Sequence, residues 1–210
     1  MNRLTKLYIS IVTVVSLAVF IFCWRFFGIT VSWERFLLLI LFSWLLDSVP
    51  VVMERFSNHS IILAGGMVVN LIAAILFGPS VAFAVAFVAS LFSLSSWFKL
   101  FPPMKALFNA SQIGISAAMA GLVSLALGET TSNIAFVINV LLAAISYAGV
   151  NLLLMAGAFY TIDPKKAHER LKTFPSIVLV GLLPMTFVAV IGVVLYRYMG
   201  IIAIPIIIAV

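Results

Sequence analysis

The sequence carries very little charge. Only 9% of its 210 residues are Asp, Glu, Lys or Arg, whereas about a quarter of a soluble domain is charged. The longest polar stretch, from Thr161 to Ser176, is far shorter than the roughly 50 residues that a separate water-soluble domain needs. Because 65% of the residues are hydrophobic, a soluble globular protein is excluded and lipid must surround most of the chain.

The sequence also lacks the motifs with which enzymes hold metals, phosphates or nucleophiles. It contains no His-Glu-x-x-His, Cys-x-x-Cys, Gly-x-Ser-x-Gly or P-loop pattern. The two histidines, His59 and His168, lie far apart in different predicted loops, and no predicted span holds a pair of acidic residues. We therefore expect no catalytic residues, metal site or cofactor in this chain.

A single cysteine, Cys23, excludes an internal disulfide. It lies in the first apolar run, where a thiol behaves as a small apolar side chain. Arg3 and Lys6 precede that run as they would in a signal peptide, but it reaches Phe22 with no small-residue cleavage site after it. We therefore expect a retained membrane span.

Long apolar runs dominate what is present. A helix needs about 20 residues to cross the roughly 30 Å of hydrocarbon in a bilayer. Hydropathy predicts an all-α integral membrane protein, with residues 1–210 forming one transmembrane domain of seven full spans and a partial eighth. The expected spans are 7–27, 36–53, 60–78, 81–98, 106–127, 134–160 and 177–196, and the last begins near Ile201 and is expected to continue past Val210.

Proline and glycine mark the expected breaks. Gly78-Pro79-Ser80 predicts a tight turn between the third and fourth spans, and Pro102-Pro103 should stop the helix before a basic loop. Pro164 and Pro175 bracket the longest expected loop, and Pro184 should kink the seventh span, as neighbouring helices allow in membranes.

The basic residues predict the orientation. With a cytoplasmic N-terminus, three of the twelve Lys and Arg residues lie outside, namely Arg25, Arg35 and Arg197. The other nine lie inside: Arg3, Lys6, Arg55, Lys99, Lys105, Lys165, Lys166, Arg170 and Lys172. The positive-inside rule supports this arrangement, and the net charge of +6 then reflects topology and anionic lipid. No basic stripe with interleaved aromatic residues indicates nucleic acid as a partner.

Asp47 is the acidic residue that lies well inside a predicted span. Placing its charge there costs about 2.5–3.5 kcal/mol, so the carboxylate needs a partner, a cavity or water. It is either a ligand or proton site, or an acid close to the membrane interface.

Polar residues also lie inside the fifth predicted span. Asn109 and Gln112, in Phe108-Asn109-Ala110-Ser111-Gln112, are three residues apart and share a helix face. They form either a polar wall of a ligand pocket or hydrogen-bonding contacts between helices. The small residues that follow, Gly114, Ala118 and Gly121, predict close helix packing.

Four further polar residues present the same choice between ligand binding and packing: Asn70, Asn139, Tyr147 and Asn151. Several amides with one acid suit a neutral or weakly charged ligand better than a metal ion.

Four passages together resemble a known family. They are Ala64 to Ser80, Leu107 to Gly128, Tyr147 to Asn151, and Leu183-Pro184 followed by Leu195-Tyr196 and Gly200. Their order is similar to that of the membrane-associated sensor (MASE-like) region that precedes HD-GYP phosphodiesterase or GGDEF diguanylate cyclase domains in bacterial cyclic-di-GMP signalling proteins. The likeness covers roughly residues 53–210, and the Phe-Asn-x-x-Gln passage is its most specific part.

The resemblance implies a sensory input domain in the bacterial cytoplasmic (inner) membrane. Its last span would lead into a cytoplasmic output module, and a homodimer is the expected form. No HD-GYP or GGDEF sequence is present here, so any turnover of cyclic-di-GMP would belong to that other module. The resemblance assigns no ligand residues.

Two other functions are compatible with the same residues. One is the small-molecule-binding membrane subunit of a vitamin-type (energy-coupling factor) importer, which is also a compact basic bundle with a polar pocket. The other is a structural or assembly factor without a ligand.

Overall fold

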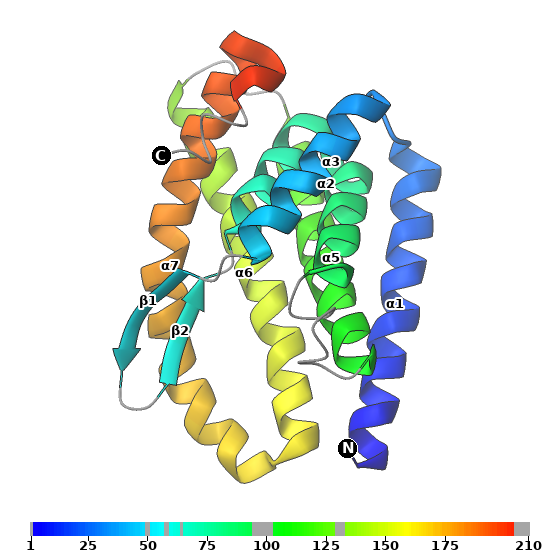
Figure 1. Cartoon of the computed structure of the whole chain (residues 1–210), viewed down its shortest axis with the longest axis vertical. Helices are drawn as coiled ribbons and strands as arrows, with labels where there is room; N and C mark the ends of the chain where they lie inside the picture. Colours follow the sequence, from blue (N-terminus) through cyan, green and yellow to red (C-terminus); the bar gives the residue numbers. More distant parts are fainter. Residues whose placement is uncertain are drawn as a thin grey trace.

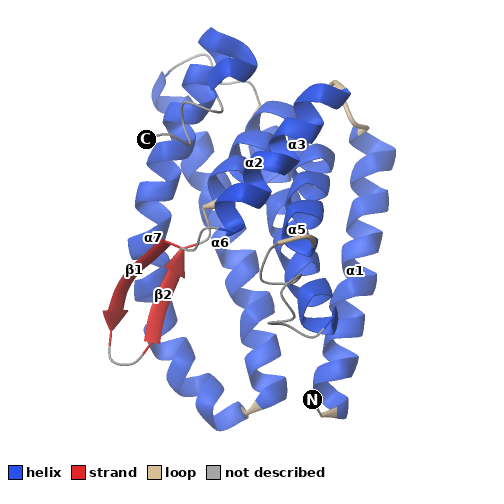
Figure 2. Ribbon diagram, in the orientation of Figure 1, coloured by secondary structure: helices blue, strands red, loops and turns tan. Residues whose placement is uncertain are grey.

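The computed structural model describes residues 2–48, 51–56, 59–63, 65–93, 103–128 and 133–203. These residues form helices α1 (Arg3–Phe27), α2 (Trp33–Ser48), α3 (Gly66–Leu91), α5 (Pro103–Leu127), α6 (Asn133–Ile162) and α7 (Pro164–Met199), the strands β1 (Val51–Phe56) and β2 (His59–Leu63), and the 3-10 turn η1 (Gly200–Ile202). The helices form a bundle, and the two strands form a hairpin at one side of it (Figures 1 and 2). The protein is thus mainly helical, as expected.

By total length and composition alone, five helical segments could cross a membrane: α1, α3, α5, α6 and the Gly181–Met199 part of α7. Helix α2, with 16 residues, is shorter than the usual membrane span. The expected count of seven full spans and a partial eighth is therefore not supported. The ends of the expected fourth and eighth spans, residues 94–98 and 204–210, lie outside the described residues.

The outer surface of the bundle is apolar. Large hydrophobic side chains are exposed on several helices, for example Val14 of α1, Leu153 of α6 and Phe187 of α7. Soluble monomers rarely expose apolar patches of this extent, whereas lipid covers them at no cost. The protein therefore lies in a membrane.

The second and third expected spans differ most from the structure. Helix α2 ends at Ser48 instead of continuing to residue 53, and α3 begins only at Gly66. An antiparallel hairpin lies between them, with Val51 opposite Leu63, Phe56 opposite His59 and a register shift between Val52 and Glu54. Pro50 cannot continue a helix, and β-branched residues favour strands, which hydropathy alone does not distinguish from helix.

Helix α7 also differs from the expectation. It begins at Pro164 and continues through Pro175, where the longest loop was expected. A proline fits well in the first turn of a helix because its missing N–H would have no helical partner there. Pro175 lies farther along α7, where a proline removes one backbone hydrogen bond. A membrane helix tolerates this loss when neighbouring groups satisfy the freed carbonyl.

Helix α3 folds back on itself at Gly78. Gly78 has φ 81°, a left-handed conformation that favours glycine, and Pro79 follows it. Both ends of α3 reach the last turns of α2, because the Gly66 N–H donates to Asp47 Oδ1 (3.1 Å) and Trp44 Nε1 donates to the Phe92 carbonyl (2.6 Å). A straight helix of 26 residues would place its ends about 38 Å apart. The α3 hairpin therefore has two antiparallel arms, 66–77 and 79–91.

The turn of the α3 hairpin is packed between α1 and α5. A Cβ atom on Gly121 would lie 2.7 Å from Pro79 Cα, so the two backbones are in contact there. The Ser80 hydroxyl donates to the carbonyl of Cys23, which is fully buried in α1. These contacts fix the tip of the hairpin and confirm Cys23 as a buried thiol.

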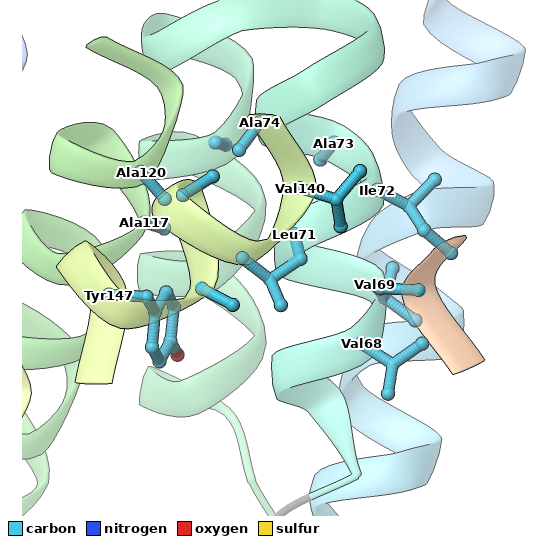
Figure 3. Packing of buried hydrophobic residues seen from close by; sticks show 14 of the residues in the cluster. Val68, Val69, Leu71, Ile72, Ala73, Ala74, Ala117, Ala120, Val140 and Tyr147 are labelled. Carbon is cyan, nitrogen blue, oxygen red and sulfur yellow. The ribbon is translucent and has the colours of Figure 1, made fainter. Parts of the chain in front are cut away.

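The core lies along the first arm of the α3 hairpin. Val68, Val69, Leu71 and Ile72 are all buried there (Figure 3). Ala117 and Ala120 of α5 and Val140 and Tyr147 of α6 join the same cluster. The α3 hairpin is thus the centre of the bundle.

Helices α1 and α6 are joined near the chain's N-terminus. Asn2 begins α1 by accepting a bond from the Thr5 N–H, and its amide donates to the Thr161 carbonyl (2.8 Å). Farther along, the Tyr8 hydroxyl donates to the Leu154 carbonyl (2.8 Å), where Gly157 leaves room for the ring. These contacts fix the height of α6 relative to α1, as the Ser80–Cys23 contact does for the α3 hairpin.

Candidate functional site

The base of the α3 hairpin meets a polar turn of α2. Asp47 is half-buried, and its Oδ1 accepts the Gly66 N–H at the start of the hairpin. A Cβ atom on Gly66 would overlap the Asp47 carboxylate, so this approach requires glycine. The first N–H groups of a helix have no partner within it, and Asp47, on a neighbouring helix, accepts a hydrogen bond from one of them.

The second arm of the α3 hairpin meets the same carboxylate through Ser90. The Ser90 hydroxyl faces Asp47 but lies outside hydrogen-bond geometry with any described group. The Gly66 N–H of the first arm and the Ser90 hydroxyl of the second arm thus both face the Asp47 carboxylate.

A chain of polar side chains runs across the bundle one helical turn from Asp47. The Ser43 hydroxyl donates to Asn70 Oδ1 (3.1 Å), and Asn70 Nδ2 donates to the Tyr147 hydroxyl (3.4 Å). The exposed fractions are 0% for Ser43, 1% for Asn70 and 4% for Tyr147. The structure therefore brings together two predicted residues, Asn70 and Tyr147, and connects α2, α3 and α6 through them.

Asn109 and Gln112 form the pair that their spacing predicts. Gln112 Nε2 donates to Asn109 Oδ1 (3.1 Å). Asn109 is exposed, whereas Gln112 is only 4% exposed. Gln112 Oε1 and the neighbouring Ser111 hydroxyl are buried without a partner among the described residues.

Asn139 lies apart from the other predicted residues. Its amide donates to the carbonyls of Ser124 (3.2 Å) and Gly128 (3.5 Å) at the end of α5. These carbonyls lack helical partners, so Asn139 acts as a cap. Asn151 lies twelve residues farther along α6, about 18 Å away along the helix axis.

The predicted small-residue face of α5 packs against the second arm of the α3 hairpin. A Cβ atom on Gly114 would lie 3.1 Å from the Phe83 ring, and Gly121 contacts Pro79. Ala118 is fully buried in the same cluster as Phe83. The face is therefore occupied within the chain, and a second copy would have to bind elsewhere.

Several of these polar groups lie at similar depth. The tip contacts place Ser80, Cys23 and Gly121 at about the same height. We use 'below' for the direction from this tip toward the N-terminal end of α1. At 1.5 Å per residue, Ser90 lies about 15 Å below Ser80, and Ser111 lies about 15 Å below Gly121. By the same measure, Ser16 lies about 10 Å below Cys23. Asn151 lies about 18 Å below Asn139, which contacts Ser124 one turn above Gly121.

We call this set the polar layer: Ser16, Asp47, Ser90, Ser111, Gln112 and Asn151. It lies near mid-height of the bundle, because Thr5 on α1 is about 27 Å below Cys23. Asn70, one turn along α3 from Gly66, and Tyr147, to which its amide donates, border this layer.

The polar layer concentrates unpaired buried oxygens. Among the described residues, seven buried side-chain oxygens have no hydrogen-bond partner, and five belong to this layer: Ser16 Oγ, Ser90 Oγ, Ser111 Oγ, Gln112 Oε1 and Asn151 Oδ1. An unpaired buried polar atom costs about 1–3 kcal/mol, and native proteins have few of them. These oxygens lie at a similar depth on four helices, and the polar layer is therefore the candidate functional region.

Sequence reasoning missed Ser16, Ser43 and Ser90. Ser43 precedes Asp47 by four residues, so the two share a helix face, and this spacing was the one feature of the sequence that could have indicated Ser43. The described residues contain no group of three or more His, Cys, Asp or Glu that could hold a metal ion. The polar layer instead contains hydroxyl and amide oxygens and one acid.

An apolar groove adjoins the base of the α3 hairpin. It has a volume of about 220 Å³ and lies between α2 and the second arm, lined by Leu37, Ile40, Leu41, Trp44, Val88, Ala89 and Phe92. Its apolar lining suits lipid chains.

Comparison with known proteins gives one family-level finding. The family model MASE9 matches residues 18–210. No curated protein and no solved structure shows a significant match.

Proposed function

The chain belongs to the MASE9 family of membrane-associated sensor domains, and on this premise we propose that it is the input domain of a cyclic-di-GMP signalling protein. A sensor domain of this family is not itself catalytic. In our proposal residues 1–210 act as one unit that regulates a cytoplasmic HD-GYP phosphodiesterase or GGDEF cyclase module of the full-length protein.

The polar layer is the observation that carries the proposal. A ligand shifts a protein between two arrangements only if it interacts differently with them. Unpaired oxygens on α1, α3, α5 and α6 offer such an interaction, because a ligand that forms hydrogen bonds with any of them favours the arrangement in which it can reach them.

The contacts around the layer offer a route for the signal. The chain from Ser43 through Asn70 to Tyr147 connects α2 and α3 to α6. Only Asp163 separates the end of α6 from the start of α7. A change in the layer that moves α6 would therefore displace the start of α7.

The same proposal includes a location and an assembly. We place the protein in the bacterial cytoplasmic membrane as a multi-pass protein with its N-terminus in the cytoplasm, since the basic residues Arg3, Lys6 and Lys165 then lie inside, beside the joined ends of α1 and α6. We also propose a homodimer, because two input domains that move against each other can reorient paired output modules.

The full-length native gene product tests the proposed function. Membrane vesicles containing it should turn over cyclic-di-GMP or synthesise it from GTP, and deletion of residues 1–210 should change that rate several-fold. The internal substitution Asn70→Leu, which breaks the polar chain to Tyr147, should change the rate in the same direction. A rate unaffected by the deletion, or a gene product without such an activity, would contradict the proposal.

A further inference from the structure

We propose that the apolar groove between α2 and the second arm of the α3 hairpin binds one acyl chain of a phospholipid with an amine headgroup, whose ammonium group lies at Glu34. The inference goes beyond the proposed function, because it names a lipid as a bound partner. It does not rest on that function, since lipid binding can be measured on this chain alone.

The size and lining of the groove are the first reason. Its volume is about 220 Å³, and an apolar cavity of about 150 Å³ is already large enough to hold benzene. The lining is apolar apart from the indole N–H of Trp44, which already donates to the Phe92 carbonyl. Leu37, Leu41 and Phe92 are exposed, so the groove opens on the outer surface of the bundle. A run of methylene groups in it would contact both walls.

The depth of the groove is the second reason. Helix α2 begins at the end of the bundle at which α1 ends (Figure 1), and the exposed Trp24 and Trp33 lie there. Tryptophan is enriched where a membrane meets water, so the start of α2 lies at the membrane surface. Along the α2 axis, Leu37 lies about 5 Å and Trp44 about 15 Å from Glu34. The groove therefore descends from the headgroup region into the hydrocarbon, as a lipid chain does.

The charges at the start of α2 are the third reason. Glu34 precedes Leu37 by three residues and Leu41 by seven, so it lies on the face of α2 that lines the groove. Its carboxylate attracts an ammonium group and repels a headgroup of net negative charge. The charge of the adjacent Arg35 acts on Glu34, and a guanidinium group can bind the lipid phosphate. A zwitterionic amine lipid thus matches both charges.

The test uses Trp44 as the reporter, because bromine atoms on a lipid chain quench tryptophan fluorescence on contact. The chain has four tryptophans, and in the test protein the other three are replaced by phenylalanine. The full chain in detergent micelles is titrated with dibrominated phosphatidylethanolamine or dibrominated phosphatidylglycerol. We expect the quenching of Trp44 to saturate at a low lipid fraction, and phosphatidylethanolamine to act at an about fivefold lower fraction than phosphatidylglycerol.

A chain with Trp24 as its single tryptophan is the reference. Trp24 is exposed on α1 and does not line the groove, so its quenching should rise gradually with the lipid fraction. Val88→Phe places a ring in the groove and should raise the lipid fraction that quenches half of the Trp44 signal about tenfold. Val14→Phe, the same replacement at an exposed position on α1, is the matched control and should have no effect.

Glu34→Gln tests the headgroup. It removes the charge and keeps the size of the side chain, so quenching of Trp44 should still saturate while the preference for phosphatidylethanolamine disappears. An equal response of the original chain to the two lipids, or a preference that survives in Glu34→Gln, overturns the assignment of an amine headgroup.

Three results overturn the groove site itself. The first is the same lipid dependence for Trp44 and Trp24, which indicates only the lipid shell around the protein. The second is a folded Val88→Phe protein with unchanged quenching; if that variant does not fold, the comparison of Trp44 with Trp24 still decides. The third is an unquenched Trp44 in a dimer detected by light scattering, which means that a second copy covers the groove. The proposed function is decided separately, by deletion of residues 1–210 from the full-length protein.

Discussion

At its turn the α3 hairpin is held by backbone packing, and at its base it is held by polar side chains. At the turn, Pro79 lies against Gly121, and the Ser80 hydroxyl is paired with the Cys23 carbonyl. At the base, Asp47 and Trp44 each bind one arm, while the Ser90 and Ser111 hydroxyls remain unpaired among the described residues.

The difference indicates which end of the hairpin can move. Close backbone packing has one good arrangement, because displacement opens a void or creates a clash. Polar groups with unused hydrogen-bonding capacity can exchange partners at little cost once a ligand supplies them. We therefore infer that the turn is a fixed point and that the base is the adjustable end.

The largest effect is expected from a substitution at the turn of the α3 hairpin. Gly121→Ala places a Cβ atom 2.7 Å from Pro79 Cα, and backbone cannot move aside as a flexible side chain does. We expect a loss of about 2–3 kcal/mol in the free energy of unfolding, typical of overpacking. Denaturation in mixed micelles measures it.

Gly149→Ala is the control for this prediction. Nothing lies within 4 Å of a Cβ atom at Gly149, which also lies inside a helix. This variant should be neutral or slightly stabilising, by up to about 1 kcal/mol, because alanine favours helix over glycine. Equal effects of the two substitutions would show that the turn is not the rigid end.

A smaller effect is expected at the base. Gly66→Ala pushes the Asp47 carboxylate away from the start of the α3 hairpin, but that side chain can rotate. We expect a loss of about 1–2 kcal/mol, the value of one charge-assisted hydrogen bond to a helix N-terminus. Repeating the substitution in an Asp47→Ala background should remove most of this loss. An undiminished loss there would mean that Gly66 is required for some other reason.

The smallest effect is expected at the edge of the polar layer. Tyr147→Phe removes the acceptor of the long 3.4 Å bond from Asn70 and should cost about 0.5–1 kcal/mol of stability. Tyr160→Phe, at an exposed position on the same helix, should cost almost nothing. A cost above about 3 kcal/mol for Tyr147→Phe would place the fixed point of the bundle at the base rather than at the turn.

Much of the helical framework could be predicted from the sequence. Helices α1, α5 and α6 have ends within a few residues of the predicted spans, because each is one long apolar run with clear breaks. The turn at Gly78 was predictable from a glycine and a proline in succession. The strands were not, since hydropathy measures preference for lipid and says nothing about hydrogen bonding between residues 51–56 and 59–63.

The candidate site was only partly predictable. Asp47, Asn70 and Tyr147 stood out as polar residues in apolar spans, but their relation depends on which helix faces meet, and this is set by packing between distant segments. Ser16 and Ser90 gave no signal, because serine is common in membrane helices and usually bonds to its own backbone. An unpaired hydroxyl becomes visible only in three dimensions.

The hairpin shape of α3 also has a consequence for membrane insertion. Its 26 residues carry no charge, and it returns the chain to the height at which it began. Such a segment can enter the bilayer as one unit, and it leaves the sidedness of the next segment unchanged whether or not its tip reaches the far surface. Its depth can therefore vary during evolution without inverting α5, α6 and α7.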